Sequence, residues 1–553
     1  MGKTTRAQRW VTIRRLLRVR ADMKVESSTV GMVLFSALVF ALLPGTLNAK
    51  GAKSEHKSNA LAKKISSLLA QPEFGRGYWG IQIFSLDDRK VLYANNADKL
   101  FVPASNTKLF TTTTALALLG PDYRFHTTVE ASALPDKYGR IDGDVALVGR
   151  GDPNLSGRNL PYALKTERTQ SSTIALENMA DQLVRAGVKY IDGDVVADDS
   201  FYVDEPYGAG WAQDDLQWGY GAPVSALTIN DNLIFLNILP GANSGDRAFV
   251  TLDPPTAYYK VENRTVTVAT GGTHKIGVHR DLGSHVVTVW GAVTVNDGLD
   301  REELAAEAPA EFAAQVFYEI LSRHGIVIYG HTRVQHTLAT SIVSQDVPAA
   351  AILPLGATPP PAAQAPAAVL ASYDSLPLIE DLRVINKTSQ NLHAEMALRL
   401  IGKTGAGIGN TETGLKVEQN FLTQAGLLPE EYDLHDGCGL SRENLVSPAA
   451  AVKLLQYAAA QPWAAKFQDT LPVAGVDGSL TDRWKGTDVI GHVRAKTGTM
   501  DHVNALSGYA MTLGGKNVAF SIMVNNHNLK NGEVRETIDK IVQAIVEDET
   551  GKK

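Results

Sequence analysis

The tetrapeptide Ser105-Asn106-Thr107-Lys108 opens the run SNTKLFTTTTALALL (residues 105–119), and the fold can be inferred outward from it. Pro103 stands just before this run, and a proline next to an apolar, periodic stretch predicts the start of a helix. Positions i and i+3 share one face of a helix, so Lys108 is expected to reach the hydroxyl of Ser105. SxxK sequences also arise by chance, and a serine at a helix start is usually a cap. The motif therefore needs partners elsewhere in the chain.

Two further motifs follow, and with the first they form an ordered set. Ser389-Gln390-Asn391 is an SxN motif at the start of a predicted helix, and Lys496-Thr497-Gly498 is a KTG motif on a predicted strand. A second KTG sequence, residues 403–405, follows a helical pattern directly, and we reject it because no strand precedes it. The set SxxK, SxN and KTG, in this order, is found in penicillin-binding proteins and serine β-lactamases.

These residue types fit nucleophilic catalysis by a serine. A free lysine has a pKa of about 10.4, so Lys108 can act as the base at neutral pH only if its pKa is lowered. Lowering it by ~3 units takes ~4 kcal/mol, which burial and a neighbouring cation, here Lys496, can supply. Ser389 would relay the proton toward the leaving amine, and Asn391 would hold the substrate and Lys108 in register. The amino end of the helix at Ser105 favours the negative charge that develops on the attacked carbonyl.

The KTG strand offers a binding site for the end of a peptide. Gly498 has no side chain, which lets a substrate backbone lie along the strand edge. The ammonium of Lys496 and the hydroxyls of Thr497 and Thr499 can then hold a terminal carboxylate. This arrangement predicts a carboxypeptidase.

The two ends of the chain share helix and strand patterns that the middle lacks. Residues 123–345 read mostly as short strands, with helix candidates at 173–186 and 302–324, and contain the pentapeptide IDGDV twice, at 141–145 and 191–195. Residues 346–369 are rich in Pro and Ala and predict an exposed loop. We therefore expect a discontinuous catalytic domain, residues 57–122 and 370–548, interrupted by an insertion of two β-rich subdomains. The strands expected in the catalytic domain are residues 78–85, 90–95, 493–497, 508–512 and 517–524.

The spacing of the first two motifs separates the families that share them. Ser105 and Ser389 are 284 positions apart, which is far too long for a β-lactamase. In this the chain resembles the low-molecular-mass class C penicillin-binding proteins, the D-alanyl-D-alanine carboxypeptidase/endopeptidase family, which carry a large insertion there. The resemblance implies an α/β (α+β) fold: a β-lactamase-like transpeptidase domain, with an antiparallel sheet flanked by helices and a helical subdomain, plus a large β-rich insertion. Other stretches that resemble this family are residues 149–153, 210–215, 222–227 and 436–442.

The resemblance also implies a function and a substrate. Ser105 would be acylated by the D-Ala-D-Ala end of peptidoglycan stem peptides and then released by hydrolysis, with endopeptidase action on cross-links, and β-lactam antibiotics would capture it covalently. In relatives, an acidic and an aromatic residue of the insertion meet the amino-acid end of a diaminopimelate side chain. The matching residues here are Asp215 and Tyr220, with Met500 across the cleft, although an Asp in a loop is also a common turn residue. Gln213 stands where some relatives have Trp, which leaves the side-chain preference open.

Two positions depart from the patterns of the related families. Gln390 stands where class A β-lactamases have Asp. Cys438 stands where relatives commonly have Ser, and His435, three residues away, offers a base for a cysteine nucleophile. The interpretation that we favour for Cys438 is a small residue between two glycines in a turn.

Composition and charge exclude several classes of function. The formal charge is −6, and the first 49 residues carry eight basic against two acidic side chains, so the remainder stands at −12. An acidic body is a poor partner for nucleic acid, whose binding needs clustered positive charge. With one cysteine, no HExxH sequence and no histidine cluster, the sequence predicts neither a metal nor a cofactor.

Residues 1–49 predict export as a signal peptide or signal anchor. Gly31–Leu43 is an apolar run of 13 residues between a basic region and small residues, which is typical of a signal peptide and short for a permanent anchor. An uncleaved anchor remains the alternative because the basic lead is long, and translation from Met23 would give a more typical signal. We expect the protein in the periplasm or at the outer surface, where peripheral or N-terminal membrane association is compatible with this segment.

Two other functions are compatible with the same motifs. A catalytically idle protein that binds peptidoglycan or β-lactams could keep the fold, but the presence of all five motif residues disfavours it. A β-lactamase is disfavoured by the long insertion and by the lack of a recognisable device for fast deacylation. The sequence therefore favours a serine D-Ala-D-Ala carboxypeptidase.

Overall fold

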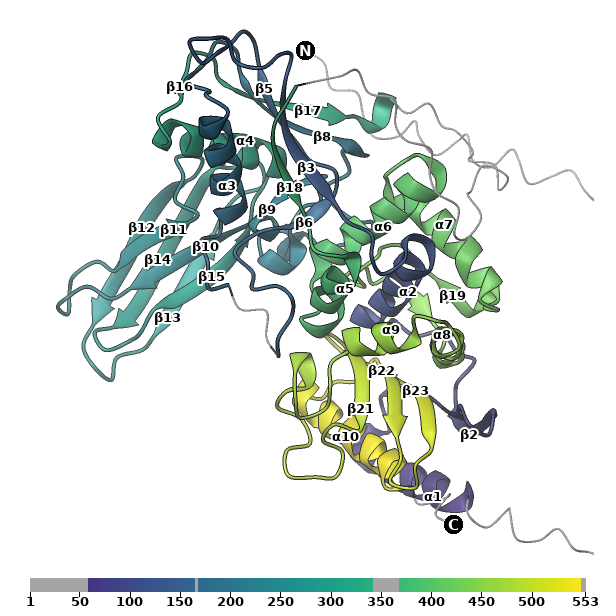
Figure 1. The fold of residues 1–553 in the computed structure, drawn as a ribbon. Coiled ribbons are helices and arrows are strands. Elements are labelled where there is room, and N and C mark those ends of the chain that lie inside the picture. The colour runs from purple at the N-terminus through teal and green to yellow at the C-terminus, as the bar shows by residue number, and fades with distance from the viewer. Residues whose placement is uncertain (1–57, 165–167, 342–367, 549–553) are drawn as a thin grey trace, which may run out of the picture. The chain divides into compact units, whose positions relative to one another are not determined.

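The computed structural model describes residues 58–164, 168–341 and 368–548 (Figure 1). The predicted signal region, residues 1–49, and the predicted Pro/Ala-rich loop as far as residue 367 lie outside these ranges. Within them, no helix is both long and apolar enough to cross a membrane.

A five-stranded antiparallel sheet joins the two ends of the chain. Its order is β2-β1-β23-β22-β21, so that N-terminal β1 lies beside C-terminal β23, with Ile81 opposite Ile522. The predicted strand 508–512 is longer than expected and begins at Val503, because its whole length pairs with β23. The strands are β1 (Tyr78–Ser85), β2 (Lys90–Asn95), β21 (Val493–Met500), β22 (Val503–Met511) and β23 (Asn517–Asn525).

Helices cover both faces of this sheet (Figure 1). Phe520 and Ile522 of β23 belong to the hydrophobic cluster of α1 and α10, whereas Ala519 and Met523 belong to that of α8, as the alternation of side chains along a strand requires. Next to α8, further helices form the helical subdomain around α2 and α6. The helices are α1 (Ser58–Leu69), α2 (Thr107–Leu119), α5 (Leu378–Lys387), α6 (Asn391–Ala406), α7 (Thr411–Gln424), α8 (Pro448–Ala459), α9 (Ala464–Thr470) and α10 (Asn531–Val546), with the short strands β19 (Tyr432–Asp433) and β20 (Leu445–Val446).

The region between α2 and α5 is rich in strands, and the repeated pentapeptide lies at its centre. The two IDGDV copies pair in parallel, Ile141 with Ile191 and Val145 with Val195. A third segment, residues 328–332 with the sequence IYGHT, pairs in the same way, since Ile328 pairs with Ile191 and Thr332 pairs with Val195. The paired strands are β4 (Arg140–Ile141), β7 (Tyr190–Ile191) and β16 (Val327–Ile328), followed by β5 (Val145–Val148), β8 (Val195–Val203) and β17 (Thr332–Thr337).

The strands β5, β8 and β17 belong to a five-stranded sheet of the insertion, whose order is β17-β8-β5-β3-β18. Its last strand, β18 (Ala368–Asp374), pairs with β3 (His126–Ala131), so the sheet of the insertion continues past the loop boundary expected at residue 369. Two helices pack on it through apolar faces that include Leu176 and Phe317. They are α3 (Ile174–Arg185) and α4 (Pro309–Arg323).

The rest of the insertion consists of smaller sheets, and here the expected helix 302–324 is wrong in its first part. Residues 300–305 form β15, because they pair along their length with β10, and the helix begins only at Pro309, a residue suited to a first turn. These strands are β6 (Asp152–Leu155), β9 (Leu227–Ile229), β10 (Leu233–Leu239), β11 (Phe249–Asp253), β12 (Lys260–Val268), β13 (Lys275–His279), β14 (Val286–Thr294) and β15 (Asp300–Ala305).

Candidate active site

The three motifs, far apart in the chain, meet around one cavity of about 400 Å³. Ser105 lies in a short 3₁₀ turn (Ala104–Asn106) that leads directly into α2, and Lys108 lies in the first turn of that helix. The Lys108 Nζ is 2.9 Å from the Ser105 Oγ and 2.7 Å from the Asn391 Oδ1. The Lys496 Nζ on β21 is 2.8 Å from the Ser389 Oγ. Helix spacing and tertiary packing thus bring all five motif residues together.

The Lys108 amine is placed to take a proton from Ser105. Its side chain is fully buried, and burial lowers its pKa, while the nearby acidic groups of the 436–438 loop and α6 oppose that shift. Besides Ser105, the Nζ contacts the Asn391 Oδ1 and, at 2.6 Å, the backbone oxygen of Cys438. A neutral amine has two N–H groups and one lone pair. If the two oxygens accept the two N–H groups, the lone pair faces the Ser105 hydroxyl.

Lys496 and Ser389 form the second polar pair of the cavity. Burial lowers the pKa of Lys496 well below its usual value, and the charge of Lys108 lowers it further. The sequence predicts that the charge of Lys496 lowers the pKa of Lys108. In the structure the effect falls on the other lysine, since the charge of Lys108 lowers the pKa of Lys496. Ser389 has a φ of 64°, a conformation that non-glycine residues rarely adopt and that is enriched at functional sites. The surrounding structure therefore holds the backbone of Ser389 in this conformation.

The loop at residues 436–441 supplies the backbone oxygen that contacts Lys108. Glu395 on α6 accepts hydrogen bonds from the backbone N–H groups of Gly437 and Cys438, at 2.7 and 2.8 Å. Gly439 has a φ of 87°, and a Cβ there would lie 1.9 Å from the backbone oxygen of Ala104. Only a glycine fits, because the loop packs directly against the turn that carries Ser105.

The Cys438 thiol donates a hydrogen bond to the Asp436 carboxylate at 3.6 Å and is hydrogen-bonded to neither Ser105 nor Lys108. It is buried, and burial raises its pKa well above the usual value, which is the opposite of what a nucleophilic thiolate needs. His435 lies nearest to two carboxylates, Asp433 at 3.4 Å and Glu443 at 3.6 Å. The geometry therefore supports the turn-residue interpretation.

One group among the described residues has metal-ligand spacing: Glu395, Asp436 and Cys438, whose ligand atoms lie within 4.8 Å of one another. The oxygens of Asp436 already accept the N–H groups of Gly439 and Ser441, at 2.7 and 2.6 Å. These hydrogen bonds show that Asp436 holds the loop at residues 436–441 in place.

The KTG strand lies at the edge of the five-stranded sheet, where a peptide can add to it. Thr499 is exposed and lines the cavity, and the Thr497 Oγ1 is 2.8 Å from the Ser479 Oγ. The structure gives Gly498 a reason beyond substrate access. A Cβ at Gly498 would lie 2.6 Å from the backbone oxygen of Pro103, so the glycine is needed for the strand to pack against the nucleophile turn.

The residues predicted to recognise a side chain line the same cavity. The Tyr220 Oη donates a hydrogen bond to Asp215 at 3.1 Å, and the Tyr220 backbone oxygen accepts one from Asn391 at 2.8 Å. Burial raises the pKa of Asp215. Met500, at the end of β21, also lines the cavity. Four further residues that the sequence did not single out line the cavity: Gly439, Leu440, Arg442 and Asp501. The first three lie in the stretch 436–442 that resembles the family, and Asp501 directly follows Met500.

Comparison with known proteins decides the family. The model of the D-Ala-D-Ala carboxypeptidase 3 (S13) family matches residues 61–546. The chain belongs to this family. It is therefore a serine-type D-Ala-D-Ala carboxypeptidase, and the predicted family and enzyme class are confirmed.

Individual relatives agree with this assignment. This S13 carboxypeptidase is 32% identical over 520 residues to the D-alanyl-D-alanine carboxypeptidase of Actinomadura sp. (strain R39), covering 92% of this chain and 88% of the relative. It is 25% identical over 455 residues to the D-alanyl-D-alanine carboxypeptidase DacB of Haemophilus influenzae, covering 80% and 84%. The crystal structure of penicillin binding protein 4 (dacB) from H. influenzae aligns with a TM-score of 0.69 at 22% identity, covering 88% and 99%. The predicted fold class is confirmed.

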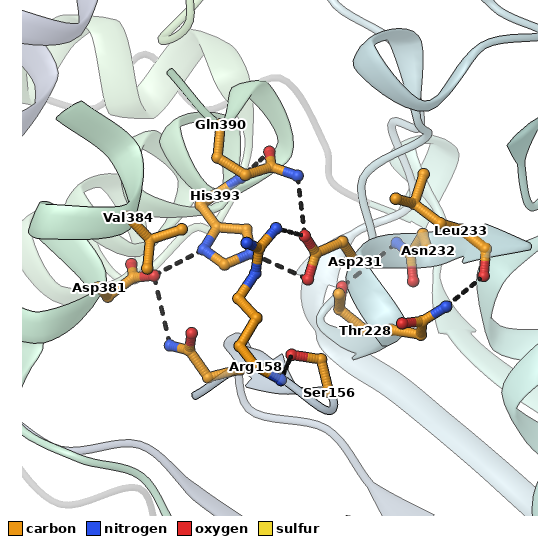
Figure 2. A network of polar contacts seen from close by, with 12 residues as sticks. Ser156, Arg158, Thr228, Asp231, Asn232, Leu233, Asp381, Val384, Gln390 and His393 are labelled. Atoms are coloured by element: carbon orange, nitrogen blue, oxygen red, sulfur yellow. Dashed lines mark hydrogen bonds and ion pairs between the residues drawn. The ribbon is translucent and has the colours of Figure 1, made fainter. Parts of the chain in front are cut away.

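A buried ionic network connects the SxN motif of this S13 carboxypeptidase to the insertion (Figure 2). Asp231 is fully buried, and its carboxylate accepts hydrogen bonds from Arg158, from Arg168 at 2.5 Å and from the Gln390 side chain at 3.1 Å. The Gln390 oxygen in turn accepts the backbone N–H of His393 at 3.4 Å and caps α6. Gln390 thus ties the motif loop to a carboxylate of the insertion, a role that its place in the motif did not reveal.

The network continues through His393. Its Nδ1 is 2.7 Å from Asp381 and its Nε2 is 3.4 Å from Asp231. These two carboxylates outweigh the effect of burial and raise the pKa of His393 to about 9, so the ring is a cation at neutral pH. Asn230, Asp231 and Asn232 all have a positive φ, between 49° and 57°. Such a strained turn persists only where the surroundings fix it, which the buried ion pairs do here.

Proposed function

We propose that this S13 carboxypeptidase acts through an acyl-enzyme on Ser105 and cleaves both terminal D-Ala and the cross-links of peptidoglycan stem peptides. The observation that carries the proposal is the contact between Lys108 and the Ser105 hydroxyl, at 2.9 Å, in a cavity that adjoins the edge strand β21. The nucleophile and a surface for an extended peptide therefore share one cavity, and the base contacts the nucleophile from the buried side.

The first half of the reaction forms the ester. The Ser105 Oγ attacks the carbonyl carbon of the penultimate D-Ala, and its proton passes to the Lys108 Nζ. The carbonyl oxygen then carries negative charge, which the amino end of α2 stabilises. The tetrahedral intermediate collapses when the C–N bond breaks, and the leaving amine takes a proton that reaches it through Ser389. Water then attacks the ester and restores Ser105.

The substrate carboxylate is proposed to lie at the KTG end of the cavity. The hydroxyls of Thr497 and Thr499 can donate to it, and Lys496 lies next to them on β21. Because burial lowers the pKa of Lys496, an arriving carboxylate favours its protonated form and so gains an ion pair. A free carboxylate end is thus recognised by charge and by hydrogen bonds.

The opposite end of the cavity is proposed to receive the amino-acid end of the diaminopimelate side chain. Asp215 offers a carboxylate for an ammonium group, and the exposed Arg442 offers a guanidinium for a carboxylate. The Arg442 Nη1 donates to the backbone oxygen of Asp501 at 3.2 Å, which positions it over the cavity. Tyr220 and Met500 supply the walls between these charges.

Replacing Asp215 by Asn is expected to remove the preference for a free amine. Two stem pentapeptides that differ only in whether the side-chain amine is free or acetylated are compared by kcat/KM for D-Ala release. We expect the wild-type enzyme to prefer the free amine roughly tenfold, as a hydrogen-bonded ion pair provides, and the variant to show little preference. Asp214→Asn, an exposed neighbour that does not line the cavity, is the control and should keep the preference. Equal rates for both peptides with the wild-type enzyme would contradict this role.

The central experiment measures products and the lifetime of the penicilloyl-enzyme together. We expect D-Ala release from a stem pentapeptide, cleavage of a cross-linked dimer, and a penicilloyl-enzyme that persists for many turnovers of the peptide substrate. Rapid hydrolysis of penicillin would instead identify a β-lactamase, and failure to cleave either peptide would identify an idle binder. The H. influenzae penicillin binding protein 4 has been solved in complex with a β-lactam, and we propose β-lactams as covalent inhibitors here.

We also propose that the enzyme works outside the cytoplasm. Members of this family act on the cell wall, and residues 1–49 carry the pattern of an export signal. Any attachment to the membrane is proposed to be peripheral or through this N-terminal segment.

A further inference from the structure

A second cavity, of about 610 Å³, adjoins the catalytic cavity. Tyr220, Ser389 and Asn391 line both cavities. Ser105 and Asp215 line only the catalytic cavity, whereas the other walls of the second one come from the insertion and from Thr388 and Gln390. The two cavities therefore lie on either side of the SxN motif, and the second lies next to the hydroxyl that hands a proton to the leaving amine.

The walls of the second cavity carry an excess of positive charge. Three guanidinium groups line it, those of Arg158, Arg168 and Arg301, against one carboxylate, Glu303. Arg158 and Arg168 are held by Asp231, which is fully buried behind the wall and does not line the cavity. Figure 2 shows Arg158 and Asp231 in this network. Clustered positive charge in a concave site attracts anions.

Arg301 is the guanidinium most open to a ligand. Its side chain is 40% exposed, compared with 10% for Arg158 and 14% for Arg168. The Arg301 and Arg168 guanidinium groups lie 4.8 and 5.0 Å from the centre of the Phe235 ring, which is buried. The Arg301 Nε donates to the Asn237 side chain at 2.8 Å. The Arg301 Nη2 also lies 4.0 Å from the Asp253 carboxylate, which is beyond hydrogen-bond distance. A guanidinium that rests on a ring and is hydrogen-bonded only at Nε keeps its terminal N–H groups for the carboxylate of a ligand.

We propose that this cavity, the arginine subsite, binds a carboxylate of the leaving strand when the enzyme cleaves a cross-link. The inference rests on the proposed endopeptidase function. The leaving amine departs beside Ser389, so whatever is attached to it extends past that residue toward the arginine subsite. When the leaving group is a single D-alanine, it ends before the arginine subsite. The leaving strand of a cross-linked substrate continues as a peptide with further carboxylates. The subsite would therefore favour anionic cross-links over the same cross-links in amidated form.

The test compares two cross-linked dimers that are identical except for one leaving-strand carboxylate, which is free in one and a carboxamide in the other. With the wild-type enzyme we expect kcat/KM to be roughly tenfold higher for the free carboxylate. In Arg301→Gln we expect this ratio to fall to about twofold or less. Arg185→Gln, an exposed arginine of α3 that does not line the cavity, should keep the wild-type ratio. Arg158 and Arg168 are left intact because their loss would expose the buried charge of Asp231.

The outcomes separate this inference from the proposed function. If both dimers are cleaved at equal rates, the subsite is wrong and the endopeptidase function stands. If neither dimer is cleaved while a pentapeptide still loses D-Ala, the endopeptidase function fails and the subsite fails with it. A ratio in Arg301→Gln equal to that of the wild-type enzyme would also overturn the proposal. The rate of penicillin labelling, which involves no leaving strand, is measured in each variant to normalise for the amount of intact active site.

Discussion

Replacing Ser105 by alanine is expected to abolish covalent labelling by a fluorescent penicillin and to lower kcat for D-Ala release by about 10⁴-fold or more. The physical reason is that the acyl-enzyme is an ester of the Ser105 Oγ. The Lys108 Nζ contacts that oxygen at 2.9 Å, so the variant keeps the base but has no hydroxyl from which to take a proton. Labelling is measured on a denaturing gel, and D-Ala release by a coupled assay.

The matched control for this variant is Cys438→Ser, which removes the alternative nucleophile. Because the Cys438 contact with Lys108 is made by its backbone oxygen, the serine variant should retain labelling. If Ser105→Ala still labelled while Cys438→Ser did not, the nucleophile would be the cysteine and the mechanism proposed above would be wrong.

Replacing Lys108 by methionine is expected to slow acylation by penicillin about 10³-fold, the usual contribution of a general base. Lys108→Arg should not restore the rate, because a guanidinium stays charged at every accessible pH and has no lone pair to accept the Ser105 proton. Lys403→Arg, in the second KTG sequence on α6, is the control and should stay within about twofold of the wild-type rate. Rescue by arginine would show that Lys108 acts as a fixed cation.

The pH dependence of acylation provides a second measurement of the same role. A base must be unprotonated, so the rate should rise with pH as Lys108 loses its proton and then level off. Burial lowers the pKa of Lys108, and the midpoint of this rise should therefore lie below pH 10.5, the usual pKa of a lysine. A rate that falls with rising pH in the range where Lys108 titrates would mean that the ammonium form is the active one.

Some expectations from the sequence depended on local geometry, and these agree with the structure. Ser105 and Lys108 are three positions apart at a helix start, so their contact follows from the helix repeat. The strands at 78–85 and 90–95 have the expected bounds because their alternating patterns are strong. Residues 302–305 are predicted to be helical but belong to a strand, since their state is decided by pairing with β10, which local sequence does not encode.

Glycine positions show the same difference between local and distant causes. Gly498 is expected to leave room for a substrate backbone because it has no side chain, and the structure adds a second reason, since the backbone oxygen of Pro103 excludes a side chain there. Gly439 has no role predicted from the sequence, although a Cβ there would come even closer to the backbone, 1.9 Å from the oxygen of Ala104. Both contacts join segments several hundred residues apart, and their closeness appears only when the chain is folded.

By itself, the sequence indicated the chemistry of this protein: a serine with a lysine on the same helix face, a second lysine as a nearby cation, a second serine as a proton relay, and a threonine-bearing strand that can hold a carboxylate. These follow from residue type and from the fixed repeats of helix and strand. The tertiary structure alone decided which backbone oxygen completes the lysine's contacts, which carboxylate of the insertion anchors Gln390, and where three arginines gather beside Ser389. The physical reason is that such contacts depend on how distant segments pack against one another, and neither spacing nor periodicity within one segment records that packing.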